Sequence, residues 1–308
     1  EANKAVVRAG YNFCENTDIL ESQVMVEQAQ MPKGKYRNIT GNIATAWGLL
    51  AAAEKAGLPL FLGSYPITPA TDILIELAKH KSLGARVFQA EDEIAGICSA
   101  IGASFAGAMA CTSTSGPGLS LKSEAIGLAV MTELPLVIVD VQRGGPSTGL
   151  PTKTEQSDLT QALFGRNGEA PCIVVAASSS ANCFYWAFEA ARLSLETMTP
   201  TILLTDGYLG NGSQLFRIPK MADLPKINPP FATTNDPNYA PYNRDPETLV
   251  RQWALPGMDG LRHRIGGLEK LSGKGSVSTD SANHEQMVKF RKEKVERVAN
   301  RIPNQEVE

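Results

Sequence analysis

The sequence predicts an α/β fold: a parallel sheet of about six strands with helices on both faces. Between Ile39 and Gly210, short apolar runs alternate with longer helix-like stretches. The short runs are apolar throughout, as in strands that are covered on both faces. Ligands of such sheets bind beyond the carboxyl ends of the strands. The junctions that follow the strands are therefore the first places to look for chemistry.

The predicted elements follow one another along the chain. A helix is expected over residues 42–57, because this Ala/Leu-rich stretch ends at a glycine. The predicted strands are PLFLGS, ARVFQA, GAMACTST, PLVIVDV, CIVVAAS and TILLTD, and the helices between them are TDILIELAKH, DEIAGICSAIGASFA, SLKSEAIGLAVMT and ANCFYWAFEAARLSLE. After Gly210 the sequence is rich in Pro, Asn and Asp, which predicts an extended arm. A charged helix around HEQMVKFRKEKVERVAN is expected to follow it.

Charge and composition narrow the classes of partner. The chain has 29 Lys and Arg against 32 Asp and Glu, a net charge of -3, which gives no basis for binding nucleic acid or an anionic membrane. No apolar run reaches the ~18 residues of a membrane span, so a cytoplasmic protein is expected. The five cysteines and three histidines are too widely spaced to predict a metal site.

The first junction is GSYPITPATD, after the first predicted strand. Pro66 and Pro69 restrict the backbone on both sides of Thr68, so its hydroxyl and amide are held in a rigid loop. The alternative is an ordinary turn in which Thr68 or Thr71 caps the next helix, and capping is the commoner use of such residues.

The second junction, FQAEDEIAGICSAIGASFAG, begins with three acids. Acids at the start of a helix are favoured by its dipole, which explains most such clusters. Glu93, however, is followed by small and apolar residues, so its carboxylate is expected to be at least partly desolvated. Desolvation raises the pKa of a carboxyl group and suits it to proton transfer near neutral pH.

The third and fourth junctions are CTSTSGPGLSLKSE and DVQRGGPSTGLPTKTEQSDL. Backbone amides beside Gly116 and Gly118 could bind an anion or let a flat ring approach. The third junction is not a P-loop, because Leu121 precedes Lys122 where that motif needs glycine. In the fourth, Arg143 follows a strand and is suited to a two-pronged bond with a carboxylate, or alternatively to a surface salt bridge.

Taken in order, GSYPITPATD, QAEDEIAG, TSTSGPG and QRGGPSTGLPTKTEQSDL resemble the alpha subunit of 2-oxoacid:ferredoxin oxidoreductases, especially the 2-oxoglutarate type. The likeness runs from about Asn38 through the terminal helix. It implies that residues 38–218 form the pyrimidine-binding domain of a thiamine diphosphate enzyme. Residues 1–37 would be a linker or the tail of a preceding gamma-like domain, and 219–308 an arm and helix leading to a further domain. The chain is therefore expected to be a fragment.

The resemblance also implies roles for individual residues. Glu93 would hydrogen-bond the aminopyrimidine ring and so promote loss of the thiazolium proton. Thr68 and Arg143 would hold the 2-oxoacid carboxylate, and Thr152 and Lys153 would contact its distal end. Further cofactor contacts are expected from Tyr65, Pro66, Ile67, Ser115 and Gly116.

The implied reaction is the oxidative decarboxylation of 2-oxoglutarate to succinyl-CoA, with coenzyme A as co-substrate and reduction of ferredoxin. The sequence lacks the G-D-G motif and later Asn that hold magnesium and diphosphate in thiamine enzymes, and it lacks cysteines for an iron–sulfur cluster. Mg²⁺ and the cluster are therefore expected on a beta subunit, in a homodimer or an alpha–beta oligomer.

Two alternatives to this function remain open. The same fold could act on pyruvate, branched-chain 2-oxoacids or indolepyruvate. It could also be a non-catalytic α/β binding module, although the presence of Thr68, Glu93 and Arg143 together argues against that.

Overall fold

The computed structural model describes residues 1–17 and 24–304, and the chain divides into two compact units, Glu1–Lys35 and Tyr36–Glu308. The first unit contains helix α1 (Ala2–Thr17), whose apolar side chains Val6, Val7 and Tyr11 are exposed. The second unit holds every other helix and strand of the described residues. The three-part division of the sequence at residues 37 and 218 stays a prediction.

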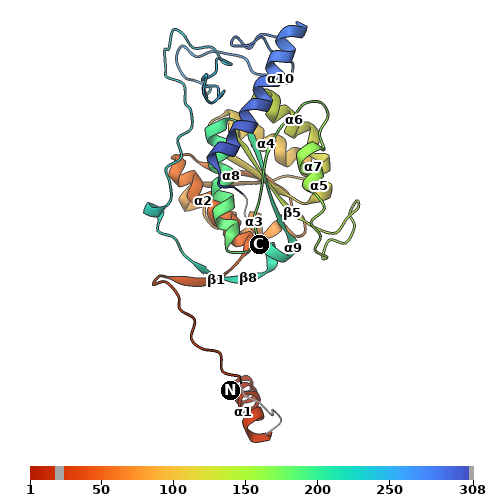
Figure 1. Ribbon diagram of the computed structural model, residues 1–308, viewed down its shortest axis with the longest axis vertical. Helices are drawn as coiled ribbons and strands as arrows, with labels where there is room; N and C mark the ends of the chain where they lie inside the picture. Colours follow the sequence, from red (N-terminus) through yellow and green to blue (C-terminus); the bar gives the residue numbers. More distant parts are fainter. Residues whose placement is uncertain (18–23, 305–308) are drawn as a thin grey trace. The chain divides into compact units, whose positions relative to one another are not determined.

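The second unit is built on a six-stranded parallel sheet, as the sequence predicts (Figure 1). Its strand order is β3-β2-β4-β5-β7-β6. The bounds are β2 (Leu60–Ser64), β3 (Ala85–Gln89), β4 (Met109–Thr114), β5 (Leu136–Gln142), β6 (Ile173–Ala176) and β7 (Pro200–Asp206). All six lie on the six predicted apolar runs. β4, β5 and β7 are buried along their whole length, which explains why their apolar residues do not alternate with polar ones.

Helices cover both faces of the sheet. One face packs against α2 (Gly41–Ala56), α3 (Thr71–Ala78) and α8 (Asn182–Thr197), and the other against α4 (Glu93–Phe105), α5 (Gly116–Leu121) and α6 (Ser123–Thr132). Two short helices, α7 (Leu159–Phe164) and α9 (Gly207–Asn211), follow β5 and β7. Gly48 lets α2 approach α8 closely, since a Cβ there would lie 2.3 Å from the carbonyl oxygen of Phe184.

A two-stranded antiparallel ribbon lies outside the main sheet. It pairs β1 (Tyr36–Thr40) with β8 (Ser213–Arg217). This ribbon is not predictable from the sequence pattern, because its strands are mostly exposed and carry no continuous apolar run. The 3₁₀ helices are η1 (Lys81–Leu83), η2 (Met221–Asp223) and η3 (Arg297–Arg301).

The predicted arm is present, and it leads to the predicted terminal helix α10 (Ser281–Glu296) (Figure 1). Glu133, which follows α6 and is 1% exposed, joins both to the sheet domain. Its carboxylate accepts hydrogen bonds from Arg244 in the arm and from Lys294 in α10. The arm is therefore attached by buried ion pairs as well as by apolar contacts. Over the described part of the chain, no helix is both long and apolar enough to cross a membrane.

Candidate functional site

The carboxyl ends of β2, β4 and β5 meet at one edge of the sheet. The chain leaves β2 towards the outer strand β3 and continues inward through β4, so the strand order reverses between them. Crevices at such reversals are the usual ligand sites of open α/β sheets. A cavity of about 760 Å³ lies here, and its lining includes Ile67, Glu93, Gly116, Arg143 and Asp158.

The structure brings together part of the predicted set. Ile67, Glu93, Gly116 and Arg143 line this cavity, each from a different junction. The other predicted residues are not among its lining: Tyr65 and Ser115, which are buried, and Pro66, Thr68, Thr152 and Lys153, which are exposed.

Glu93 is the first residue of α4. Asp92 caps this helix, because its carboxylate accepts a 2.8 Å hydrogen bond from the amide of Ala95. The side chain of Glu93 is half-buried, in agreement with the expected partial desolvation. Behind it, Gly96 lies against β2, where a Cβ would be 3.2 Å from the carbonyl oxygen of Gly63. Ile94, in contrast, is exposed, so one side of the helix start faces outward.

A glycine provides the space beside Glu93. A Cβ on Gly118 would lie 2.1 Å from Thr114 Oγ1, 2.3 Å from the Tyr65 hydroxyl and 2.9 Å from Glu93 Cγ. Thr114 and Tyr65 are hydrogen-bonded to each other at 2.9 Å. Burial, opposed by the Thr114 hydrogen bond and reinforced by Glu93, raises the pKa of Tyr65. Only glycine lets these three side chains converge here.

Lys122 contacts Glu93, although no motif in the sequence points to it. Its side chain is fully buried, its Nζ donates a 2.8 Å hydrogen bond to the backbone carbonyl of Glu93, and the same Nζ lies 4.7 Å from the centre of the Tyr65 ring. Burial lowers the pKa of Lys122 to about 8, against the opposing effect of Glu93. Through these two contacts, Lys122 holds the first residue of α4 in place.

Arg143 is buried at the other side of the cavity, with 6% of its surface exposed. Its guanidinium donates to the backbone carbonyls of Thr68 at 2.7 Å and Thr148 at 3.4 Å. Its Nε is buried and has no partner among the described residues. The alternative of a surface salt bridge is therefore wrong.

The capping alternative for the first junction is also wrong. The N-cap position of α3 is Ala70, and no side chain caps it. The hydroxyl of Thr71 accepts a 2.8 Å hydrogen bond from the amide of Ile67 and donates to the carbonyl of Ile67 at 3.0 Å. Thr71 therefore stabilises the turn that carries Thr68. The contact between Thr68 and Arg143 uses the carbonyl of Thr68, whereas the prediction concerned its hydroxyl.

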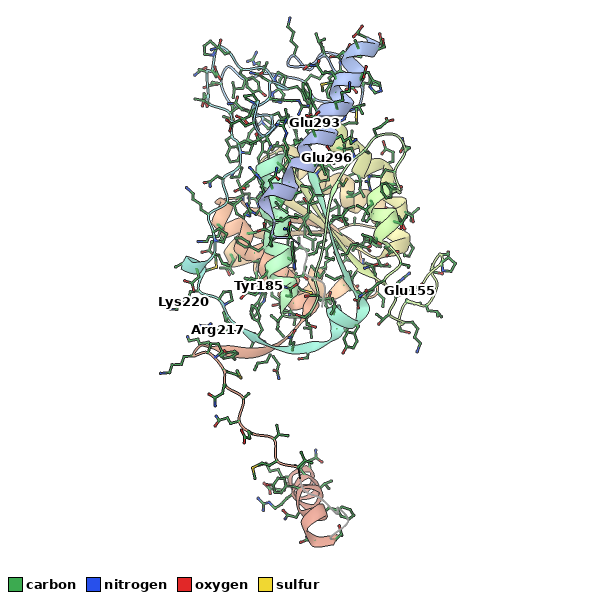
Figure 2. The ribbon with its side chains drawn as sticks, viewed as in Figure 1. Glu155, Tyr185, Arg217, Lys220, Glu293 and Glu296 are labelled. Atoms are coloured by element: carbon green, nitrogen blue, oxygen red, sulfur yellow. The ribbon has the colours of Figure 1, made fainter. Side chains whose placement is uncertain are left out.

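The loop after Arg143 is closed on itself. The amide of Gly144 donates to the carbonyl of Lys153 at 2.9 Å, and the amide of Gly145 donates to the carboxylate of Glu155 at 2.9 Å. Glu155 lies in this loop at the edge of the domain (Figure 2). Thr152 and Lys153 are exposed here, and their contact with a substrate stays a prediction.

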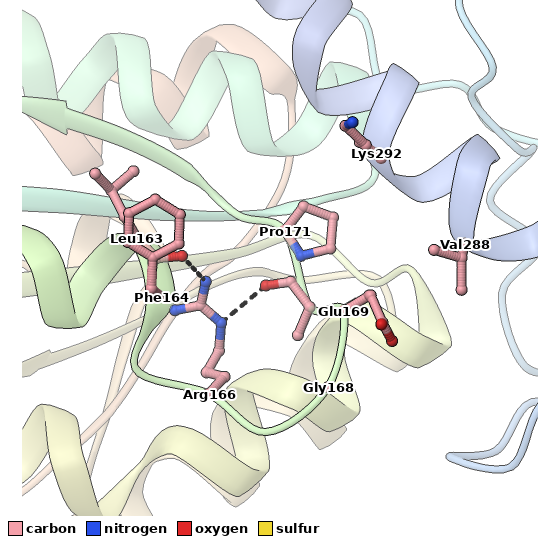
Figure 3. A pocket seen from close by; sticks show the side chains of 9 residues that line it. Leu163, Phe164, Arg166, Gly168, Glu169, Pro171, Val288 and Lys292 are labelled. Atoms are coloured by element: carbon pink, nitrogen blue, oxygen red, sulfur yellow. Dashed lines mark hydrogen bonds between the residues drawn. The ribbon is translucent and has the colours of Figure 1, made fainter.

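A second cavity, of about 270 Å³, lies between the segment 163–171 and α10 (Figure 3). Arg166 donates to the carbonyls of Leu163 and Ala170, both at 2.9 Å, and so holds this segment closed. None of the predicted site residues lines this cavity. The His, Cys, Asp and Glu residues within 1–17 and 24–304 form no cluster of three or more that could hold a metal ion.

The larger cavity combines features that suit one kind of ligand. Ile67, Pro117 and Leu121 provide an apolar wall against which a flat ring can pack. The carboxylate of Glu93 can accept or share a proton with a ring nitrogen. These residues therefore fit an aminopyrimidine, and Arg143 fits a carboxylate bound beside it.

The fold and the cavity define a doubly wound α/β ligand-binding domain with its site at the reversal of strand order. The chain belongs to the pyruvate flavodoxin/ferredoxin oxidoreductase, thiamine diphosphate-binding family, whose profile matches residues 52–279. The family predicted from the four junctions is thereby confirmed.

Individual relatives agree with this family. The 2-oxoglutarate oxidoreductase subunit KorA of Mycobacterium tuberculosis is 54% identical over 308 residues, which cover 100% of this chain and 47% of that protein. The 2-oxoglutarate synthase subunit KorA of Methanothermobacter thermautotrophicus is 38% identical over 265 residues, 86% of this chain and 68% of that protein.

A solved structure is similar over nearly the whole chain. It is the 2-oxoglutarate:ferredoxin oxidoreductase from Magnetococcus marinus with 2-oxoglutarate, coenzyme A and succinyl-CoA bound. Its TM-score is 0.86 at 36% identity, covering 97% of this chain and 52% of that one. The present chain therefore spans about half the length of this protein and of the M. tuberculosis relative.

Proposed function

We propose that this chain is the pyrimidine-binding part of the alpha subunit of a 2-oxoglutarate:ferredoxin oxidoreductase. The reaction is the decarboxylation of 2-oxoglutarate in the presence of coenzyme A, which yields succinyl-CoA and passes electrons to ferredoxin. The observation that carries the proposal is the cavity in which Glu93 and Arg143 lie together. The names of the relatives from M. tuberculosis and M. thermautotrophicus, and the ligands of the M. marinus structure, support 2-oxoglutarate as the substrate.

In this proposal, Glu93 hydrogen-bonds the aminopyrimidine of thiamine diphosphate. Its position at the first residue of α4, with the carbonyl held by Lys122, supports a fixed orientation for the carboxylate. When bound, thiamine diphosphate supplies a nucleophilic carbon and accepts the electron pair that decarboxylation releases. Ile67 and Gly116 line the cavity around the ring, and Tyr65, Pro66 and Ser115, which lie outside that lining, remain expected cofactor contacts.

Arg143 binds the carboxylate of the 2-oxoacid through its guanidinium. Arg143 lines the cavity, and its bond to the Thr148 carbonyl is long, at 3.4 Å, so a substrate carboxylate can replace that partner. The hydroxyl of Thr68 assists it from the neighbouring loop. Thr152 and Lys153 contact the distal carboxylate when their loop folds towards the cavity.

The chain requires a beta subunit to act. The rim of the cavity exposes Leu121, and Ile94 beside Glu93 is also exposed, which supports a partner surface at this point. The proposed beta subunit holds Mg²⁺, the diphosphate and the iron–sulfur cluster, and the complex works in the cytoplasm as an alpha–beta oligomer.

The test is to purify the full-length subunit with its beta partner and to measure 2-oxoacid-dependent reduction of a low-potential acceptor. Pyruvate and 2-oxoisovalerate are compared with 2-oxoglutarate under the same conditions. We expect 2-oxoglutarate to give the highest kcat/KM. Faster turnover of pyruvate would contradict the substrate assignment.

A further inference from the structure

Two buried aspartates lie at the cavity, Asp158 in its lining and Asp140 behind it, and none of the roles above uses them. Asp140 belongs to β5 and is fully buried, and neither of its carboxyl oxygens has a partner among the described groups apart from the facing carboxyl group of Asp158. Asp158 ends the loop that begins at Arg143, is 7% exposed and lines the cavity. Asp140 is in register with Thr114 of β4, two residues before Gly116, and the carboxylate of Asp158 lies against Gly116, so the two aspartates are close neighbours.

Within residues 1–17 and 24–304, no Lys, Arg or His side chain forms an ion pair with either aspartate. Glu155 is the charged neighbour of Asp158 in its own loop, and Glu93, at the start of α4, and Arg143, directly after β5, line the same cavity. Arg143 donates to backbone carbonyls, and Asp206 at the end of β7 accepts from Gln156. Two buried carboxylates in contact without a cation are strongly unfavourable, so one of them retains its proton. Burial raises the pKa of both carboxyl groups, and the charge of Asp158 raises that of Asp140 further, which favours the proton on Asp140.

The carboxylate of Asp158 lies against Gly116, one of the predicted cofactor contacts, in the lining of the cavity. A Cβ on Gly116 would lie 2.6 Å from Asp158 Oδ2 and 2.7 Å from Oδ1. The amide of Asp158 donates to Gln142 Oε1 at 2.9 Å, next to Arg143 in the sequence. This hydrogen bond joins the residue directly before the loop 143–157 to the residue directly after it, beside the cavity.

We propose that Asp140 and Asp158 are positioning residues that share one proton, and that this proton holds the loop 143–157 in place over the cavity. When the proton is lost to solvent, the two carboxylates repel each other. Asp158 then moves away from Gly116, and the loop 143–157 becomes mobile. The proposal deepens the proposed function and rests on it for the identity of the ligand in the cavity. The state of the loop, in contrast, can be followed without substrate.

The experiment uses the full-length subunit purified with its beta partner. Hydrogen–deuterium exchange of the loop is measured by mass spectrometry over a pH series for the wild type, Asp140→Asn and Asp140→Leu. Asparagine keeps a neutral donor in the place of the acid, whereas leucine has none. Comparing the variants at the same pH removes the intrinsic pH dependence of exchange.

We expect Asp140→Asn to protect the loop at every pH and Asp140→Leu to expose it at every pH. Protection in the wild type, relative to Asp140→Asn, should fall roughly tenfold per pH unit above the upper ionisation of the pair. Gly116→Ala removes no ionisable group but displaces Asp158, and it should expose the loop as Asp140→Leu does. The infrared spectrum of the wild type should contain a protonated carboxyl band that Asp140→Asn lacks.

Equal exchange in Asp140→Asn and Asp140→Leu would overturn the proposal, as would a ratio of wild type to Asp140→Asn that does not change with pH, or the absence of the infrared band. If these signatures are found but 2-oxoglutarate is not turned over, the proposed function fails and the shared proton stands.

Discussion

Lys294 Nζ lies 2.6 Å from Glu133 Oε2, although 161 residues separate them in the chain. Both side chains are almost fully buried, at 3% and 1% exposure. Arg244 from the arm contacts the same carboxylate, so three distant segments meet at one buried charge. Burial alone would raise the pKa of Glu133, but Lys294 and Arg244 more than offset it and lower the pKa.

Glu133→Gln should therefore destabilise the protein. The substitution leaves the charges of Lys294 and Arg244 buried without their partner, which typically costs about 3–5 kcal/mol. The measurement is urea unfolding of the full-length subunit with its partner. Lys292→Met in the same helix, which breaks an exposed pair with Glu296, is the control and should have no measurable effect. Equal stability of Glu133→Gln and wild type would contradict the role of the cluster.

Glu93→Gln tests the proposed proton transfer. Glutamine keeps the shape of the side chain but cannot take up or release a proton, so kcat should fall by ~10²–10⁴-fold. The assay is the 2-oxoglutarate-dependent reduction of a low-potential acceptor. Glu91→Gln, on an exposed residue two positions earlier, is the matched control and should retain activity. A Glu93→Gln enzyme with the wild-type rate would exclude Glu93 from the chemistry.

Arg143→Lys tests carboxylate binding. Lysine keeps the charge but loses the two-pronged geometry and the bond to the Thr68 carbonyl. A hydrogen bond to a charged group contributes ~1.5–3 kcal/mol, so KM for 2-oxoglutarate should rise by roughly 10–150-fold. KM is measured for both 2-oxoglutarate and coenzyme A. Loss of carboxylate binding should raise only the KM for 2-oxoglutarate and leave the KM for coenzyme A unchanged. A parallel rise in both would indicate a general disturbance of the fold.

Gly118→Ala tests the shape of the cofactor site. The added Cβ would meet Thr114 and Tyr65 at 2.1 and 2.3 Å, so both side chains and the neighbouring Glu93 must move. Thiamine diphosphate binding, measured by calorimetry on the complex, should weaken at least tenfold. Gly102→Ala is the control, because its Cβ would meet no atom within 4 Å. Unchanged affinity in Gly118→Ala would show that the cofactor does not depend on this contact.

The sequence predicts the centre of the sheet well because β4, β5 and β7 are buried on both faces. An unbroken apolar run such as Leu136–Val139 indicates such a strand by itself, so local composition is enough to find it. The ribbon of β1 and β8 depends on pairing between segments far apart in the chain, for example Tyr36 with Arg217, and composition carries no trace of it. The same holds for the ion pairs of Glu133, whose partners lie in the arm and in α10.

The candidate site was predictable in part for a related reason. Glu93 and Arg143 stand in recognisable motifs at strand ends, and the family resemblance identifies them. Lys122 and Asp158 carry no motif of their own, and their importance comes from burial beside Glu93 and Gly116. Burial of a charged side chain is a property of its neighbours in space, so the sequence alone does not reveal it.

Lys122 gives the last prediction, a dependence of stability on pH. Its pKa in the folded protein is about 8, lowered by burial, and in the unfolded chain ~10.4. Between these values the unfolded chain binds more protons at this side chain, so the free energy of unfolding rises with pH, by up to ~1.4 kcal/mol per pH unit. Lys122→Met should lack this rise in urea unfolding of the complex, whereas Lys220→Met, on an exposed lysine (Figure 2), should keep it. The free energies of unfolding of wild type and Lys122→Met are compared from pH 8 to ~10. If their difference stays constant, Lys122 is as well solvated in the folded protein as in the unfolded chain, which contradicts its buried contact with the Glu93 carbonyl.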